Sequence, residues 1–373
     1  MPWKEMNAMS LRAEFVVLAR QKGSNIRELC RRYPISSRTA YKWLGRYQQE
    51  GEAGLADRSR RPKRSPKQTS KAMEAVVVAV REETGWGGRK IARVLAKRGL
   101  ERVPHPNTVT DILRRNGKLD EAACAHHDPA QRFERSLPNE LWQMDFKGHF
   151  AMLTGRCHPF TVLDDHSRFC LGLRACPNET GGTVRTHLQS IFQQYGLPQA
   201  ILCDNGGPWG QGYPTWDLSA LAVWLIRLGI YPLHGHPAHP QTQGKDERFH
   251  RTLKVELLQG RSFADLADCQ HHFDAWRDRY NLWRPHEALG LDPPVEHFQP
   301  SQRPYPQALP LVEYNSGDIV RKVSSNGDVT YHNRPFRVGR GLVGQYVLLK
   351  PTPLDGCLDV FFCQYMVRQI VIA

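Results

Sequence analysis

The chain is 373 residues long, 40% of its residues are hydrophobic, and its formal net charge is +14. This composition excludes a disordered tail, and apolar runs shorter than the roughly 20 residues of a membrane span exclude a transmembrane protein. The sequence has nine cysteines and no CxxC pair, and no apolar signal segment is visible at its N-terminus. These features fit reduced thiols in a cytoplasmic protein better than a disulfide framework.

The positive charge is concentrated in the first third of the chain. Residues 1–120 contain 27 Lys and Arg against 12 Asp and Glu, a net charge of +15, so the remaining residues carry −1. A concentrated basic field usually meets a polyanion, and nucleic acid is the first candidate. A basic surface that only keeps the protein in solution is the alternative.

A helix-turn-helix domain is predicted over residues 1–56. Apolar spacing predicts a helix over 11–21. A second helix begins at a cap by Ser24 or Asn25 and ends before Pro34. A third helix runs from a Ser36 cap to about Glu50. Trp43 and Leu44 are expected to face the core. The exposed face of the third helix would offer DNA-binding groups: Ser37, Arg38, Tyr41 and Lys42.

A basic linker and a second helix-turn-helix follow. Residues 57–69 hold many charges, two prolines and no apolar side chain, so they form a solvated spacer or a basic arm along a DNA groove. Residues 70–120 predict three helices, 70–84, 87–99 and 106–118, the last capped by Asn107 with Thr108, Thr110 and Arg114 on its polar face. The arm would contact DNA through Arg60, Arg61, Lys63 and Arg64.

After a linker at 121–138, residues 139–300 predict a mixed sheet flanked by helices. A strand around Trp142 to Phe146, two strands joined by a turn at 165–168, and a helix over 179–195 come first. A fourth strand ends at Asp204, a helix covers 215–229, a fifth strand follows, and a long helix begins near residue 241. Three early strands followed by alternating helices and strands are typical of an α/β layer structure.

The end of the chain predicts a small β domain at 311–373. A proline-rich connector precedes alternating strands and a hairpin turn at Asn326–Asp328. We expect a small β-barrel that binds DNA or a neighbouring subunit.

Three acids in the central domain have no ordinary structural explanation when taken together. Asp145 lies inside a strand, Asp204 at a strand end, and Glu247 in the first turn of a helix. Singly, Asp204 is a plausible turn former, Asp145 a partner of Lys147 or Arg168, and Glu247 a helix-dipole acid. If the three converge at one rim of the sheet, their hard oxygens suit a pair of Mg²⁺ or Mn²⁺ ions acting on a phosphodiester.

At these residues the sequence resembles insertion-sequence transposases with a retroviral-integrase-type catalytic core. The similar segments are WQMDFKG, TVLDDHSR, CDNGG, HPQTQGKDERFHRTLKVEL and YNLWRPHEALG, in the family's order over 139–300. The 43 positions from Asp204 to Glu247 exceed the family's usual spacing, and 208–219 account for a longer loop. Helix-turn-helix units stand where retroviral integrases have a zinc module, and a cluster at Cys124, His126 and His127 has no second ligand pair to support zinc.

The resemblance implies an RNase H-like fold and a catalytic, metal-binding Asp145, Asp204 and Glu247 triad. Glu247 is preferred to the adjacent Asp246 because it directly precedes RFHRTLK, as in the family. It implies cleavage at the ends of a mobile element and transfer of the freed 3′-OH into target DNA, with at least a dimer on double-stranded DNA. Cations on the Glu247 helix would hold DNA phosphates: Lys245, Arg248, Arg251 and Lys254.

Two other functions fit parts of the sequence. A DNA-binding regulator would use the core domain only as structure, and a nuclease would stop after hydrolysis. The complete acid triad disfavours the first, and the tandem helix-turn-helix units disfavour the second. A transposase associated with the nucleoid in the cytoplasm is the function that the sequence predicts.

Overall fold

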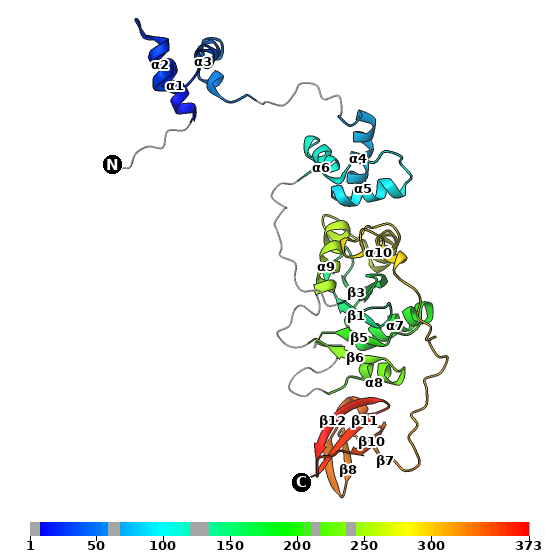
Figure 1. Ribbon diagram of the computed structural model, residues 1–373. Coiled ribbons are helices and arrows are strands. Elements are labelled where there is room, and N and C mark those ends of the chain that lie inside the picture. The colour runs from blue at the N-terminus through cyan, green and yellow to red at the C-terminus, as the bar shows by residue number, and fades with distance from the viewer. Residues whose placement is uncertain are drawn as a thin grey trace. The chain divides into compact units, whose positions relative to one another are not determined.

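The computed structural model describes residues 8–58, 68–119, 134–204, 206–209, 217–235 and 244–372. The chain divides into two compact units, Met1–Gln68 and Thr69–Ala373, drawn in Figure 1. Within the described ranges no helix is both long and apolar enough to cross a membrane.

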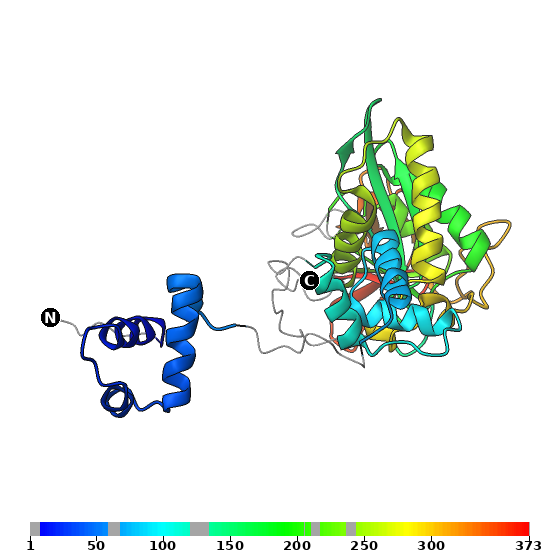
Figure 2. The ribbon, with the colours of Figure 1, turned by 90° about the horizontal axis from the view of Figure 1, so that it is seen from above.

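The first unit is the predicted three-helix domain. It contains α1 (Ala8–Ala19), α2 (Ile26–Arg32) and α3 (Ser37–Glu50), which Figure 2 shows from above. The side chains of Asn25 and Ser36 accept hydrogen bonds from free backbone N–H groups and begin α2 and α3. Trp43 is buried beside Phe15 and Val16, and Leu44 packs against the same cluster, as predicted.

The second helical domain contains α4 (Lys71–Thr84), α5 (Gly88–Lys97) and α6 (Pro106–Arg115) around one apolar core. The predicted cap of the last helix was wrong by two residues. His105 is the cap, and its Nδ1 accepts a hydrogen bond from the Asn107 N–H at 3.3 Å. Pro106 explains the shift, because a proline has no N–H to satisfy and its fixed φ suits the first helical position.

The central sheet contains β1 (Leu141–Phe146), β2 (Phe150–Ala151), β3 (Arg156–Asp164), β4 (Cys170–Cys176), β5 (Ala200–Cys203) and β6 (Tyr231–His234). Its order is β2-β3-β1-β5-β6, with β4 also paired to β3. The pairs β1–β3 and β3–β4 are antiparallel, whereas β5 runs parallel to both β1 and β6. The predicted mixed sheet is therefore confirmed.

Helices cover both faces of this sheet (Figure 1). On one face, α7 (Gly181–Tyr195) and α8 (Ala220–Arg227) pack in a cluster that includes Trp142 and Met144 of β1. On the other face lie α9 (Gly244–Leu253), a π-helical segment Lys254–Leu258 and α10 (Leu266–Leu282). Because side chains alternate along a strand, Gln143 and Asp145 of β1 point away from the Trp142 cluster and toward α9.

The C-terminal domain is rich in strands, but among its described residues they form no closed barrel. β7 (Ile319–Lys322), β10 (Tyr346–Pro351), β11 (Cys357–Phe362) and β12 (Tyr365–Val371) form one antiparallel sheet in the order β12-β11-β10-β7. A separate two-stranded sheet pairs β8 (Asp328–Tyr331) with β9 (Arg334–Arg337). The barrel expectation is replaced by these two sheets.

The hairpin turn is also not where the sequence predicted it. The Asn326–Asp328 segment joins β7 and β8, which belong to different sheets. The observed hairpin turns at His332 and Asn333, whose φ angles are 47° and 61°. Two successive positive φ values are what a tight two-residue hairpin turn requires.

We expect Gly88→Ala to destabilise the α4–α6 domain. A Cβ at this position would stand 2.6 Å from the Pro106 carbonyl oxygen and closer still to Thr110 Oγ1, so α5 and α6 would have to separate. The predicted loss is about 1–3 kcal/mol in urea unfolding followed by circular dichroism. Gly87→Ala is the control, because a Cβ there meets no atom within 4 Å. Equal effects at the two glycines would contradict this close helix contact.

Candidate active site

Asp145 and Asp204 lie side by side at the ends of two neighbouring strands. Strand β1 pairs in parallel with β5 through Gln143 and Leu202, and continuing that register by two residues brings Asp145 level with Asp204. Adjacent strands are about 4.8 Å apart. Burial, with added repulsion from the Asp204 carboxylate, raises the pKa of Asp145 to about 7. The two predicted acids therefore share one patch of negative potential.

Helix α9 is anchored directly over Asp145. His250 lies 3.9 Å from an Asp145 carboxylate oxygen through Nδ1, and its Nε2 is 2.9 Å from Thr161 Oγ1. Thr161 in turn donates a hydrogen bond to the Asp145 carbonyl oxygen at 3.0 Å. Burial and the charge of Lys147 lower the pKa of His250 to about 4, so the imidazole is neutral at pH 7. This contact positions α9 and adds no positive charge beside Asp145.

The two acids in the first turn of α9 have opposite environments. Glu247 is exposed, whereas Asp246 is 3% exposed and its Oδ1 has no hydrogen-bond partner among the residues that the structure describes. Burial, together with the charges of Asp145 and Asp165, raises the pKa of Asp246 well above its usual value. Consecutive helical residues point about 100° apart, so only one of the two can face the sheet. In this structure Asp246 faces it.

Of the three predicted acids, Asp145 and Asp204 lie at neighbouring strand ends, and Glu247 is exposed on α9. Within the described ranges, no three His, Cys, Asp or Glu side chains are arranged to hold a metal ion. Residues 236–243, directly before α9, lie outside those ranges. Two observations still fit a hard divalent cation: the adjacent carboxylates of Asp145 and Asp204, and the buried Asp246 carboxyl oxygen, which no donor of the described part of the chain reaches.

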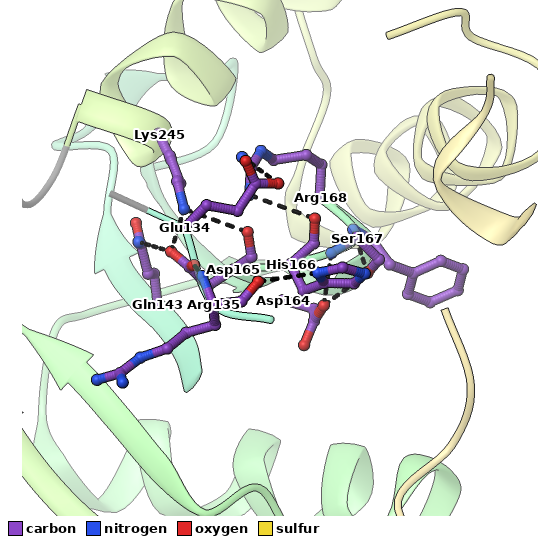
Figure 3. A network of polar contacts seen from close by, with 10 residues as sticks. Glu134, Arg135, Gln143, Asp164, Asp165, His166, Ser167, Arg168 and Lys245 are labelled. Carbon is purple, nitrogen blue, oxygen red and sulfur yellow. Dashed lines mark hydrogen bonds and ion pairs between the residues drawn. The ribbon is translucent and has the colours of Figure 1, made fainter. Parts of the chain in front are cut away.

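A polar network behind the acids joins β1, the β3–β4 turn and α9 (Figure 3). The carboxylate of Asp165 is fully buried, and its Oδ1 accepts from Gln143 Nε2 at 2.7 Å and from Lys245 Nζ at 2.5 Å. Its Oδ2 accepts from the Arg135 backbone N–H at 2.9 Å. The network thus ties the first turn of α9 to the strand that carries Asp145.

Sequence reasoning missed the roles of Gln143, Asp164 and Asp165. Asp164 shapes the turn, since its carboxylate accepts from the backbone N–H groups of Asn139 and Ser167. The available signal was the Asp-Asp pair at the end of an apolar strand, where two consecutive buried acids require partners. For Lys245, the predicted phosphate ligand, the structure has the ammonium paired with Asp165.

The other predicted DNA contacts of the central domain are open to solvent. Arg248, Arg251 and Lys254 are exposed on α9 and the π-helical segment that continues it. Arg248 lies 3.9 Å from Glu287, and its side chain is 73% exposed. Lys254 lies close enough to Lys147 to contribute to lowering the pKa of that residue. Lys254 therefore lies near the end of β1, the strand that carries Asp145.

The helix-turn-helix residues divide by location. Ser37, Arg38, Tyr41 and Lys42 are all exposed on one face of α3. On α6, Thr108 is half-buried and Arg114 is exposed in a 2.5 Å ion pair with Asp111. Thr110 instead donates to the Pro106 carbonyl oxygen and abuts α5. Two sets lie outside the described residues: Arg60, Arg61, Lys63 and Arg64 of the predicted arm, and Cys124, His126 and His127.

Comparison with protein families identifies domains along most of the chain. Models described as integrase core domain match residues 135–240 and 228–294. A helix-turn-helix domain matches 11–63 and a homeodomain-like domain matches 39–113. The C-terminal domain of IS481 family transposases matches 318–372. The chain carries helix-turn-helix domains, an integrase core and a transposase C-terminal domain.

Proteins of mobile elements are among the relatives. A protein of insertion element IS476 from Xanthomonas euvesicatoria is 29% identical over 182 residues, which are 49% of this chain and 50% of that protein. The transposase of transposon Tn552 from Staphylococcus aureus is 24% identical, over 86% of this chain and 74% of its own. The chain spans about half the length of the first relatives it matches.

Two chains of viral proteins are among the solved structures that match. A chain of the simian T-cell lymphotropic virus intasome, in complex with PP2A regulatory subunit B56 gamma, matches with a TM-score of 0.39 and 15% identity. The match covers 79% of this chain and 95% of that chain. The HTLV-2 integrase catalytic core in complex with magnesium matches with a TM-score of 0.32 and 14% identity, over 43% of this chain and 97% of its own.

We expect Lys245→Met to destabilise the central domain, because it leaves the buried Asp165 carboxylate without its cation. The loss should be roughly 2–3 kcal/mol in urea unfolding at pH 7, less than for most broken buried pairs because Gln143 and the Arg135 N–H still donate. Arg248→Met, three residues along the same helix but exposed, should change stability by less than about 0.5 kcal/mol. Equal losses would refute a structural role for the Lys245 pair.

We expect Asp145→Asn to stabilise the metal-free chain at pH 8. The pKa of Asp145 is raised on folding, so the folded wild type loses stability as pH rises from about 4 to 7, and that loss remains above pH 7. The neutral amide avoids the loss, by at most about 4 kcal/mol. Urea unfolding in EDTA should give a larger gain at pH 8 than at pH 5. Asp278→Asn, at an exposed acid, is the control, and a gain independent of pH would contradict the raised pKa.

Proposed function

We propose that this chain, which joins helix-turn-helix domains to an integrase core and a transposase C-terminal domain, is a DNA transposase. It would cut DNA at the ends of its own element and transfer the freed 3′-OH into target DNA. The observation that carries the proposal is the juxtaposition of Asp145 and Asp204 on parallel strands of the integrase core, beneath a helix whose first turn carries two more acids. We also propose that this core has an RNase H-like fold.

Asp145, Asp204 and Glu247 would hold the metal, either Mg²⁺ or Mn²⁺. Once the three acids converge, they would bind a pair of these ions. A divalent cation bound there supplies the positive charge that a phosphodiester displacement requires. Convergence requires the first turn of α9 to rotate or shift, because Glu247 is exposed to solvent while Asp246 faces Asp145. Asp145 repels both Asp204 and Asp246, and a cation bound at Asp145 and Asp204 would replace that repulsion with an attraction for the Glu247 carboxylate.

The chain's own side chains would orient the DNA at this site. Arg248, Arg251 and Lys254 are exposed along one helix, and such a row of cations suits the spacing of backbone phosphates. The neutral His250 and Thr161 hold α9 against β1, so these cations stand at a defined distance from Asp145. Phosphate contacts of this kind position DNA without reading its sequence.

Sequence recognition would come from the N-terminal third. The exposed face of α3 offers hydroxyl, guanidinium and ammonium groups, which hydrogen-bond base edges and phosphates. The +15 charge of residues 1–120 would strengthen binding to any DNA. The element's terminal inverted repeats are the proposed specific target, and joining two ends calls for at least two copies of the chain.

The test is strand transfer in Mg²⁺ with duplexes carrying the element's terminal sequence and a plasmid target. We expect cleavage and joined products from the wild type, and a loss of at least about a hundredfold in Asp145→Asn, Asp204→Asn and Glu247→Gln. Asp246→Asn is the matched control on the same helix turn and should keep most joining activity.

Three outcomes would contradict the proposal or its site. Full joining by Asp204→Asn would remove the metal role of that acid. Loss in Asp246→Asn with activity kept in Glu247→Gln would exchange the two α9 acids. Cleavage without joining would identify a nuclease, and specific DNA binding with neither reaction would identify a regulator.

A further inference from the structure

Helix α5 carries a row of basic residues that the proposed function does not use. Arg89, Arg93 and Lys97 are spaced four residues apart, so they lie on one face of the helix, and Lys90 borders them. In a helix-turn-helix such a row is usually assigned to DNA phosphates. In this chain it faces protein instead.

Acidic residues of the segment after α10 pair with this row. Arg93 Nη2 lies 2.5 Å from Asp292 Oδ1, and Lys97 Nζ lies 2.5 Å from Glu296 Oε1 and 3.5 Å from Asp292. Arg89 lies 3.8 Å from Glu287. The order of the acids along the chain follows the order of the bases along α5, so the two charged rows match in register.

A buried polar contact completes one end of the same interface. The Glu256 carboxylate, 11% exposed, accepts from Trp86 Nε1 at 3.2 Å, Trp276 Nε1 at 3.3 Å and Arg284 Nε at 3.0 Å. Trp86 lies two residues before α5 and is itself buried. Glu256 therefore joins the helical domain to α10 and to the π-helical segment that continues α9.

The combination distinguishes a built interface from incidental surface pairs. An exposed ion pair contributes about 0–1 kcal/mol, so the α5 row alone would hold the domains weakly. The Glu256 contact adds to it, because separation of the domains would break the hydrogen bond from Trp86 to a largely buried carboxylate and would expose the buried Trp86 ring. Burial, with the charge of Arg284, lowers the pKa of Lys90 to about 8, in agreement with a closed contact at this end of α5.

We propose that the basic face of α5 is a protein-docking surface that locks the α4–α6 domain to the acidic 284–297 segment of the catalytic core within the same chain. This face is then unavailable to DNA, and α6 remains the DNA-facing helix of the domain. The α4–α6 domain and the metal-binding region move as one body, which fixes the distance between the DNA that α6 contacts and the site of reaction. The docking itself does not depend on the proposed function.

Zero-length carbodiimide cross-linking of the full chain tests the docking. The reagent joins an amine to a carboxylate in contact, so Lys97 and Glu296 should form an amide that mass spectrometry detects. A mixture of unlabelled and ¹⁵N-labelled protein distinguishes links within a chain from links between copies. The Lys118–Glu82 pair, 2.7 Å apart inside the α4–α6 domain, is the internal standard for folding. Absence of the Lys97–Glu296 link while the standard forms, or its presence only between copies, would overturn the proposal.

A charge swap tests the specificity of the interface. Arg93→Glu should lower the Lys97–Glu296 link at least about fivefold, and adding Asp292→Arg should restore it. Arg102→Glu, at an exposed arginine between α5 and α6, should leave the link unchanged. If Asp292→Arg fails to restore the link while the internal standard persists, the pairing is not the cause of docking.

Binding to a duplex of arbitrary sequence tests whether α5 is closed to DNA. The Arg93→Glu/Asp292→Arg chain, with docking restored, should keep the affinity of the wild type within about twofold and the same salt dependence. A tenfold weaker affinity with a shallower salt slope would show that Arg93 contacts phosphate, and would overturn the proposal for α5.

Discussion

Several acids on one face of the central sheet repel one another. The protonation and ion pairing of this domain depend on that repulsion. Asp145 and Asp204 share a sheet edge, and Asp246 and Asp165 lie behind them. Carboxylates so close cannot all be charged in a partly buried region unless protons or cations compensate. The raised pKa values of Asp145 and Asp246 favour their protonated forms, and the Lys245 ammonium compensates the charge of Asp165. A divalent cation is the compensation that phosphodiester chemistry would exploit.

Buried carboxylates also hold distant parts of the chain together. Asp165 binds donors from β1, from residue 135 and from the first turn of α9. Glu256 does the same for Trp86, Trp276 and Arg284. In each case one acid accepts hydrogen bonds from elements far apart in sequence, and the loss of any donor would leave a desolvated charge. The acids that position α9 and the α4–α6 domain are thus distinct from the acids proposed to bind metal.

Local patterns predicted most elements, because their causes are local. The caps at Asn25 and Ser36 began helices where the sequence placed them, and the apolar strand before Asp204 formed β5. Errors arose where a neighbour in sequence or space changed the outcome. The cap is His105 and not the predicted Asn107, because Pro106 occupies the first helical position. The hairpin turn lies at His332 and Asn333, which have positive φ, and not at the predicted Asn326. The predicted barrel required a sheet to close on itself, and closure depends on pairing between strands that are far apart in the sequence.

The sequence by itself determined which acids, cations and helical domains the chain has, because residue type and hydrophobic periodicity depend only on residues that are close together in the sequence. It also set the order of the strands along the chain, and with it the arrival of Asp145 and Asp204 at strand ends. Only the tertiary structure decided which of Asp246 and Glu247 faces the sheet, that Lys245 is paired with Asp165, and that α5 meets acids of the core. Those outcomes depend on how helices rotate and dock against partners more than a hundred residues away or on another element, and no local pattern encodes such contacts.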